Sequence, residues 1–350
     1  MNIKITKMKN LNRDFVSIII PCREINNDTK KCITECLKQS QSYKEFEIIV
    51  LPDNKEKSPF KIKKNKVKIN LKIIPTGRGT KPSVKRNLGM RKANSKTTVY
   101  AFIDSDAYPE KDWLKNAMQH IQISEVGMVG GPNLTPNEAS RDEKLSGYIL
   151  ENFIASGNAS IRYKKAKEQF VKELPSCNFI VKKQYATEFP SNLLTAEDTK
   201  FCYNILAKNK KILYSPDIVV YHHRREFLEK HTNQMWIYGR DIAFLVKKAI
   251  NSKKEDNNKE GSNKKIIKSI PYFSLLSILS IYLSLGILSD IFSSGSNGFF
   301  NFTLFVYLIA IFMTSLRKSL KITSKIFIGI IATHFAYGFG FIYGLFKKHG

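Results

Sequence analysis

One stretch of the sequence decides the fold: residues 77–113 read GRGTKPSVKRNLGMRKANSKTTVYAFIDSDAYPEKDW. A basic loop with two glycines leads into a predicted helix over 84–93, and a short apolar strand over 99–103 ends beside Asp104 and Asp106. Open α/β sheets bind ligands at the carboxyl ends of their strands. Alternate side chains of a straight strand point to opposite faces, so the chain must turn for both carboxylates to approach one hard cation. An ordinary surface turn is the alternative, since Asp and Ser are common turn residues.

A strand, a helix and a second strand precede this stretch. Residues 15–21 form a near-continuous apolar run, which is typical of a strand buried on both faces of a parallel sheet. A helix is predicted over 28–39 and a strand over 46–51, and together they make a βαβ unit with a nucleotide crevice at the strand ends. A further strand is expected over 67–75. The chain has neither G-x-G-x-x-G nor G-x-x-x-x-G-K-[ST], so a dinucleotide-binding fold and a P-loop ATPase are not supported.

An ordered set of motifs extends over most of the chain. They are VSIIIPCRE (16–24), EIIVLPDN (47–54), PSVKRNLGMRKA (82–93), FIDSDAYPEKDWL (102–114), GGPNLTP (130–136), LPSCNFIV (174–181), AEDTKFC (196–202) and YHHRR (221–225). In this order they resemble the family 2 glycosyltransferases of the GT-A fold, through about Phe244. The resemblance implies an α/β architecture, a Rossmann-like nucleotide-diphospho-sugar transferase domain, followed here by apolar C-terminal segments.

The resemblance also implies a metal site and a general base. Asp104 and Asp106 match the family's metal-binding pair, with His222 as a candidate third ligand, and Asp104 is also expected at the donor nucleotide. Mg²⁺ and Mn²⁺ both suit oxygen ligands. Glu197 and Asp198 match the family's ED motif, in which Asp198 acts as the base. Helix capping is the alternative for this pair, because acids favour helix N-termini.

Residues at the ends of the first two strands are predicted to bind the nucleotide. Pro21, Arg23 and Glu24 end the first strand, and Asp53 ends the second. Relatives usually carry Asp-Asp at the second position, where this chain has Pro52 before Asp53. Only Asp53 is therefore left to hydrogen-bond the base.

Basic side chains are expected at the diphosphate. Lys85 and Arg86 would add fixed positive charge, although a solvated helix face explains at least one of them equally well. His223 is an alternative to His222, and Arg224 suits bidentate phosphate binding. Attraction of this basic group to anionic lipid is the alternative.

The rest of the chain predicts more sheet and then a change of character. Strands are expected over 171–181 and 212–221, with a helix beginning near Ala196 between them. An amphipathic helix over 227–250 is typical of a membrane interface, or else packs on the catalytic domain as an ordinary helix. Residues 251–268 are polar and charged, as in a linker.

Three apolar stretches near the C-terminus predict membrane helices. They cover 272–292, 299–316 and 326–346, each about long enough to cross the ~30 Å hydrocarbon core. Buried core helices are the alternative. The predicted domains are an N-terminal tail (1–14), a GT-A domain (15–226), the amphipathic helix (227–250), the linker (251–268) and a membrane domain (269–350).

Basic residues around these stretches predict a multi-pass protein of the cell membrane with a cytoplasmic catalytic domain. Positive charge flanks the first and third stretches and is absent from the loop 293–298. The basic residues are Lys264, Lys265, Lys268, Arg317, Lys318, Lys321 and Lys325. Three full crossings leave Lys347 and Lys348 outside, against the positive-inside rule, so a tilted or re-entrant third segment is an alternative.

The net charge of +27 over 350 residues implies an anionic partner. No RNA- or DNA-binding signature accompanies the charge, so nucleic acid is not expected. The five cysteines form no C-x-x-C pair and suggest a reducing compartment. The sequence at 1–14 has no apolar core, so no secretory signal is expected there.

These observations predict an inverting, metal-dependent glycosyltransferase. It would use a nucleotide-sugar donor and a membrane-associated, lipid-linked acceptor in cell-envelope glycan synthesis, and the family resemblance implies that residues 176–178 shape the acceptor site. The Q-x-x-R-W motif of processive synthases is absent after the base, which favours transfer of a single sugar. The alternatives are a polyprenyl-phosphate sugar synthase and a non-catalytic sugar- or lipid-binding membrane scaffold. The sequence predicts no oligomeric state.

Overall fold

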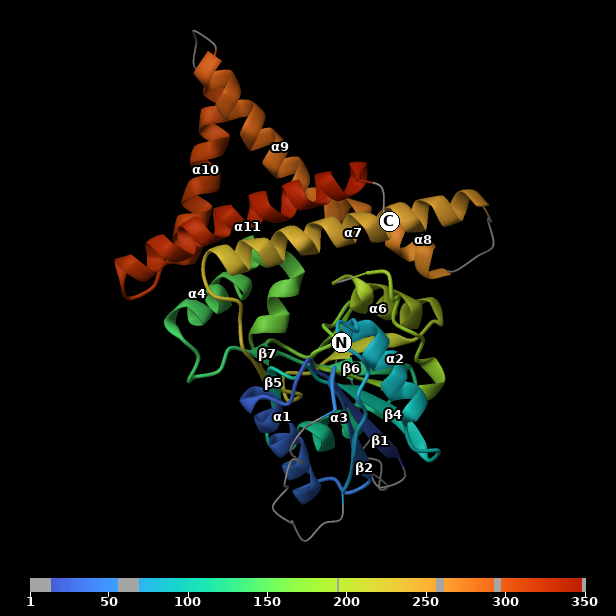
Figure 1. Ribbon diagram of the computed structural model, residues 1–350. Coiled ribbons are helices and arrows are strands. Elements are labelled where there is room, and N and C mark those ends of the chain that lie inside the picture. The colour runs from blue at the N-terminus through green and yellow to red at the C-terminus, as the bar shows by residue number, and fades with distance from the viewer. Residues whose placement is uncertain (1–13, 56–68, 194, 256–260, 293–296, 348–350) are drawn as a thin grey trace. The chain divides into compact units, whose positions relative to one another are not determined.

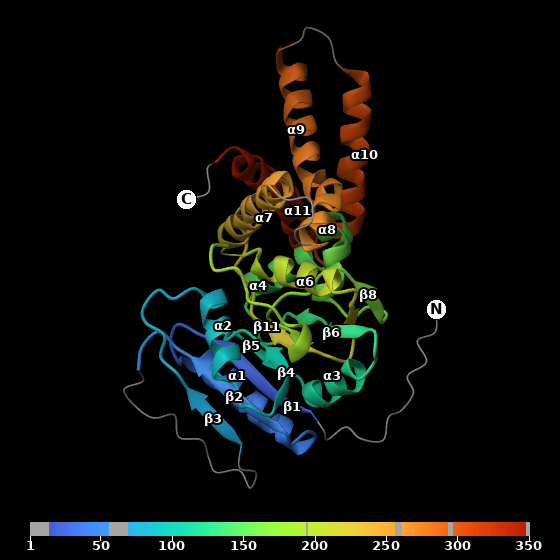
Figure 2. The same ribbon diagram turned by 90° about the vertical axis from the view of Figure 1, so that its right-hand side faces the viewer.

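The computed structural model describes residues 14–55, 69–193, 195–255, 261–292 and 297–347. Most of the predicted N-terminal tail, the start of the strand expected from Val67, part of the polar linker and most of the loop 293–298 therefore lie outside the described residues. The chain divides into two compact units (Figures 1 and 2). Unit 1 holds residues 1–136 and 164–223, and unit 2 holds residues 137–163 and 224–350. This division differs from the prediction of one continuous domain over 15–226, because the segment 137–163 groups with the C-terminal helices.

Unit 1 is built on a mixed sheet of eight strands in the order β3-β2-β1-β4-β9-β6-β10-β8. The strands are β1 (Phe15–Pro21), β2 (Phe46–Leu51), β3 (Asn70–Ile73), β4 (Thr97–Phe102), β6 (Val126–Gly130), β8 (Gln169–Val171), β9 (Phe179–Lys182) and β10 (Lys211–Tyr214). β1 pairs in parallel with both β2 and β4, whereas β9 runs antiparallel to β4 and β6. The first half of the sheet thus confirms the predicted βαβ unit. The strand expected over 171–181 is instead two strands, β8 and β9, that pair with different partners.

Helices cover both faces of this sheet, as the near-continuous apolar character of β1 requires. They are α1 (Asn27–Lys38), α2 (Pro82–Lys92), α3 (Trp113–Ile121) and α6 (Glu197–Ala207), with short 3-10 turns at Gln39–Gln41 and Lys183–Tyr185. Ile18 and Ile20 of β1 belong to the core that α1 and α3 complete, whereas Ile19 faces α2 at Gly89. A cluster of phenylalanines that includes Phe102 and Phe201 fills the space between the sheet and α6.

A second, three-stranded sheet lies at the end of β4. It consists of β5 (Ala107–Pro109), β11 (Val220–His222) and β7 (Asn133–Leu134), with β11 in the centre. The single strand expected over 212–221 is therefore two strands, β10 in the large sheet and β11 in the small one. The chain turns between them at Ser215, whose backbone N–H donates to Gly130 and whose carbonyl accepts from Ile218.

Unit 2 is helical. It contains α4 (Arg141–Leu150), α5 (Phe153–Ser156), a 3-10 helix (Gly157–Tyr163), α7 (Glu229–Glu255), α8 (Gly261–Lys268), α9 (Ile270–Phe292), α10 (Gly298–Ser315) and α11 (Leu320–Phe346). α4 begins with a capping box, because Ser140 and Glu143 each accept a hydrogen bond from the backbone N–H of the other. A polar linker was predicted over residues 251–268. In the structure α7 instead continues through residue 255, and α8 occupies residues 261–268.

Among the described residues of unit 2, three helical stretches are long and apolar enough to cross a membrane: α8 with α9 (Gly261–Phe292), α10 and α11. The three stretches differ in the share of their residues that is buried. In the most apolar part of each, 17% of residues are buried in α8–α9, 17% in α10 and 44% in α11. The predicted spans over 272–292, 299–316 and 326–346 correspond to α9, α10 and α11.

Candidate active site

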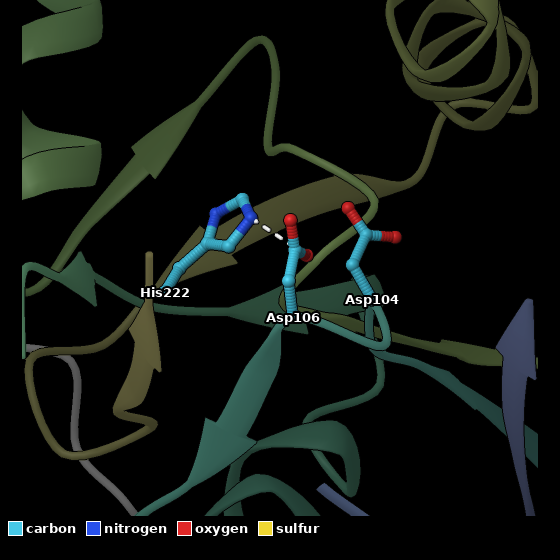
Figure 3. Close-up of side chains that lie close together, drawn as sticks. All are labelled: Asp104, Asp106 and His222. Carbon is cyan, nitrogen blue, oxygen red and sulfur yellow. Dashed lines mark hydrogen bonds and ion pairs between the residues drawn. The ribbon is translucent and has the colours of Figure 1, made fainter. Parts of the chain in front are cut away.

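Asp104, Asp106 and His222 come together where the large sheet meets the small one. The chain turns directly after β4, with the backbone N–H of Ala107 donating to the Asp104 carbonyl at 3.1 Å. β5 then pairs with β11 in a register that places His222 opposite Ala107. His222 Nε2 therefore lies 3.1 Å from Asp106 Oδ1, and one ligand atom from each of the three side chains lies within 4.8 Å of the others (Figure 3).

The three side chains are half-buried. Burial disfavours the charged imidazolium of His222, but the adjacent Asp106 carboxylate and Cys177 outweigh burial and raise the pKa of His222 to about 10. The cluster thus attracts positive charge strongly enough to hold a proton on the imidazole. A divalent cation competes for the same position, because a metal-bound histidine must be deprotonated.

The residues present fit a divalent metal ion. Two carboxylates and one imidazole form an oxygen-rich donor set that suits Mn²⁺ or Mg²⁺. No additional cluster of this kind occurs among the residues that the structure describes.

Arg86 connects this cluster to the ED motif. Its guanidinium donates through Nη2 to Asp104 Oδ1 at 2.6 Å and through Nη1 to Glu197 Oε1 at 3.2 Å. The Arg86 side chain is 4% exposed, so it is a buried cation and not part of a solvated helix face. The contacts of Arg86 orient Asp104, and its predicted role of adding positive charge at the diphosphate stays a prediction.

Glu197 and Asp198 occupy the first turn of α6. Burial and the neighbouring Asp198 raise the pKa of Glu197 to about 8, against the opposing effect of Arg86. Asp198 is half-buried; its Oδ1 accepts from the backbone N–H of Thr199 at 2.8 Å and its Oδ2 from that of Ser176 at 3.4 Å. These contacts hold the Asp198 carboxylate in one orientation, as a general base requires.

Asp53 is fixed at the end of β2 by Lys85 and by a glycine loop. Lys85 Nζ hydrogen-bonds both the Asp53 carboxylate and the Cys22 carbonyl, and the ammonium holds the pKa of Asp53 below its usual value. The backbone N–H of Gly79 donates to Asp53 Oδ2 at 3.2 Å. Gly77 and Gly79 have positive φ angles of 95° and 76°, which only glycine adopts readily. Lys85 is 2% exposed and neutralises Asp53, and its predicted role at the diphosphate stays a prediction.

The other residues predicted to bind the nucleotide are Pro21, Arg23, Glu24 and Arg224. Pro21 is buried in β1, whereas Arg23 and Glu24 are exposed just beyond it. The Arg23 carbonyl accepts from the Asp53 backbone N–H at 2.9 Å, which holds the two strand ends together. Arg224 belongs to unit 2, where its guanidinium lies 5.0 Å from the Tyr163 ring centre. Its predicted role at the phosphates stays a prediction.

Two of the residues expected at the acceptor have structural roles. Asn178 is fully buried; its amide nitrogen donates to the carbonyls of Pro132 and Ile218, and its amide oxygen accepts from the Trp113 indole. Cys177 is also buried, against Asn133. The motif could not show that the Ser176 backbone N–H donates to the Asp198 carboxylate, and the role of residues 176–178 at the acceptor stays a prediction.

The comparisons with known proteins agree with this geometry. The family model described as glycosyl transferase family 2 matches residues 17–185. A curated relative from Methanococcus voltae is 23% identical over 95% of this chain and 97% of its own, and is named dolichyl N-acetyl-alpha-D-glucosaminyl phosphate 3-beta-D-2,3-diacetamido-2,3-dideoxy-beta-D-glucuronosyltransferase. Glycosyltransferase AglE of Haloferax volcanii is 22% identical over 61% of this chain and 69% of its own.

Among solved structures, the mannosyltransferase PcManGT of Pyrobaculum calidifontis, in complex with GDP-Man and Mn²⁺, superposes with a TM-score of 0.59. It shares 14% identity and covers 96% of this chain and 88% of its own, so the likeness is one of fold. Residues 17–185 therefore form the core of a glycosyl transferase family 2 domain with the GT-A fold, and the chain is a glycosyltransferase.

Proposed function

We propose that this glycosyltransferase moves a single sugar, with inversion, from a nucleotide-diphosphate donor to a lipid-linked acceptor at the membrane. The observation that carries the proposal is the link through Arg86, which joins Asp104 of the acidic cluster to Glu197 of the ED motif within one buried network. Two motifs about ninety residues apart in sequence are thereby held at one edge of the sheet.

The donor would lie across the carboxyl ends of β1, β2 and β4, where Asp53 meets the nucleotide base. Asp104, Asp106 and His222 would hold Mn²⁺ or Mg²⁺, and such an ion neutralises the charge that develops on a leaving diphosphate. Asp53 can accept from the base through a carboxylate that Lys85 and Gly79 keep ionised and oriented.

Asp198 would remove the proton from the acceptor hydroxyl. Its two backbone hydrogen bonds orient the carboxylate, so it acts through positioning as the transition state develops. We assign Asp198 as the base and assign no carboxylate of the protein as a nucleophile. A single displacement follows, and a single displacement inverts the anomeric carbon.

The lipid-linked acceptor is supported by the apolar helices of unit 2 and by the relative from Methanococcus voltae, whose name specifies a dolichyl-phosphate-linked sugar as acceptor and which matches over nearly its whole length. The basic residues that flank these helices favour a cell-membrane protein whose catalytic domain faces the cytoplasm. Assembly of a lipid-linked glycan for the cell envelope is the corresponding process.

The test is a donor screen on detergent-solubilised protein. Nucleoside diphosphate release would be measured from UDP-, GDP- and dTDP-sugars with Mn²⁺ or Mg²⁺, with and without polyprenyl-phosphate-linked sugars. Asp198→Asn should lower the rate by roughly 10²–10⁴-fold, the usual contribution of a general base. Asp217→Asn, at an exposed carboxylate outside the site, is the matched control and should keep full activity.

Analysis of the product separates the remaining alternative. A glycosidic bond to an existing lipid-linked sugar, with the anomeric configuration opposite to that of the donor, supports the proposal. An acid-labile sugar phosphate formed on polyprenyl phosphate alone identifies a polyprenyl-phosphate sugar synthase instead. Retention of configuration, or full activity of Asp198→Asn, contradicts the assigned mechanism.

A further inference from the structure

The long helices α7 and α11 run side by side through most of their length (Figure 1). Contacts between them advance together along both chains: His231 meets Thr333, Trp236 meets Gly340, and Lys247 meets Lys347. The two helices are therefore parallel neighbours. A Cβ atom placed on Gly340 would lie 2.2 Å from the Trp236 carbonyl oxygen, so the backbones are in direct contact.

α7 cannot lie in the hydrocarbon of a bilayer. Within the part that packs on α11 it carries Arg240, Asp241 and Lys247, and Lys248 follows. On translocon-insertion scales each such charge costs about 2.5–3.5 kcal/mol at the centre of a membrane helix. Because α11 contacts α7 as far as Lys347, a membrane-spanning α11 would carry these charges into the bilayer with it.

α9 and α10 form a hairpin that packs on the middle of α11: Ser280 Oγ donates to the His334 carbonyl at 3.1 Å, and the Tyr307 hydroxyl lies 2.8 Å from His334 Nδ1. Beyond these contacts the hairpin projects away from the α7–α11 pair, clearest in Figure 2. Large apolar side chains on both helices are exposed, among them Leu285 (61%) and Phe305 (61%). At 1.5 Å per residue, 23 and 18 residues give lengths of about 34 Å and 27 Å, close to the ~30 Å hydrocarbon thickness.

Polar and aromatic groups mark the α7–α11 pair as interfacial. Trp236 and Tyr343 lie with ring centres 5.6 Å apart, and Tyr343 is 41% exposed. Tryptophan and tyrosine favour the level of the lipid headgroups. The other face of α11 is covered within the same unit, where Ile326 and Ile330 pack with Leu145 and Ile149 of α4.

From these contacts we infer that the α9–α10 hairpin alone crosses the membrane, and that α11 lies in the interface beside α7 on the side from which the hairpin enters. Two crossings place the C-terminal end on the same side as α8. All the basic residues that flank the hairpin then share that side with Lys347, while the sequence 293–298 on the far side has none. The conflict of Lys347 and Lys348 with the positive-inside rule disappears.

Cysteine labelling of the full-length protein tests this topology. Lys264→Cys, Gly298→Cys and Lys347→Cys, all at exposed positions, would be treated with an impermeant maleimide in right-side-out and inside-out vesicles. The five native cysteines are buried, so the unsubstituted chain gives the background. We expect residues 264 and 347 to react from one side and residue 298 from the other. Reaction of residue 347 from the side of residue 298 overturns the inference, and so does reaction of all three from one side.

Depth measurements give a second, independent result. Nitroxide labels would be placed at Ile328, Phe339 and Leu345, which are exposed positions on α11. The relaxation of each label by oxygen and by a water-soluble nickel complex measures its depth in lipid vesicles. We expect all three labels to lie at the same shallow depth. A label at Leu285 on α9 should lie deeper. A Phe339 label as deep as Leu285, with Ile328 and Leu345 shallow, would mean that α11 spans the bilayer.

Discussion

Arg86 Nη2 lies 2.6 Å from Asp104 Oδ1, at the end of the strand that leads to the cluster of Asp104, Asp106 and His222. The same guanidinium reaches Glu197 at 3.2 Å, so one buried cation serves carboxylates from β4 and α6. Breaking a buried ion pair by removing one partner is costly, because the other charge is left without compensation. The orientation of Asp104 and the position of α6 therefore depend on the same side chain.

Replacement of Arg86 should damage stability and activity together. Arg86→Gln should lower the free energy of unfolding of the catalytic unit by about 3–5 kcal/mol, as expected for a broken buried pair. Arg91→Gln removes an arginine from the same helix whose pair with Glu188 is exposed, and should cost about 0–1 kcal/mol. Thermal unfolding of the two variants beside the parent measures the difference. Equal melting temperatures for both variants would show that Arg86 does not hold the network together.

The metal cluster can be tested by binding alone. Asp106→Asn and His222→Ala each remove a candidate ligand atom. Loss of a residue that only orients a ligand already weakens metal binding about 10–100-fold. We therefore expect each of these two variants to weaken Mn²⁺ binding by more than that. Electron paramagnetic resonance of free Mn²⁺ during a titration measures the affinity without any substrate. Asp217→Asn is the matched control and should bind as the parent does. Unchanged Mn²⁺ affinity in Asp106→Asn would remove these residues from the metal site.

His231 makes unit 2 sensitive to acid. Its Nε2 lies 2.9 Å from Thr333 Oγ1, it is fully buried, and burial lowers the pKa of His231 to about 4. Between pH 4 and the ordinary value of 6.5 the unfolded chain therefore binds a proton that the folded chain does not. The stabilisation is complete above about pH 6.5 and is lost as the pH falls through this range, by up to about 3 kcal/mol.

Melting of detergent-solubilised protein at pH 7.5 and pH 4.5 measures this loss. The His231→Gln variant cannot take up the proton. The melting temperature of the variant should therefore fall less than that of the parent between pH 7.5 and pH 4.5. Parallel pH profiles for the two proteins would show that His231 already carries a proton in the folded state, or that α7 and α11 do not enclose it.

The sequence predicted the fold well where a local pattern decides the structure. The apolar run of β1 and the two carboxylates after β4 are local features, and the structure bears out both the strand and the turn that brings Asp104 beside Asp106. His222 was a candidate on the same basis, through its motif. Its actual position depends on the register of β11 against β5, which no local pattern contains.

What the sequence missed depends on contacts between distant segments. Arg86 and Lys85 are both basic residues on α2, and only the structure shows that Arg86 pairs with Asp104 and donates to Glu197 while Lys85 neutralises Asp53. The membrane prediction has the same limit. Hydropathy marks α11 as apolar, but it cannot show that a charged helix lies along it.

The close contact of α7 with α11 yields the last prediction, at Gly239. A Cβ atom on this residue would lie 2.1 Å from the Tyr337 carbonyl oxygen and 2.9 Å from the Phe341 nitrogen, so Gly239→Ala must push the two backbones apart. Overpacking of this kind costs about 1–3 kcal/mol, and contact with rigid backbone favours the upper end. Gly298→Ala, where a Cβ would meet nothing within 4 Å, is the matched control. Melting in detergent should be lowered for Gly239→Ala alone; if both variants melt with the parent, the helices are not in backbone contact and α11 is free to adopt another position.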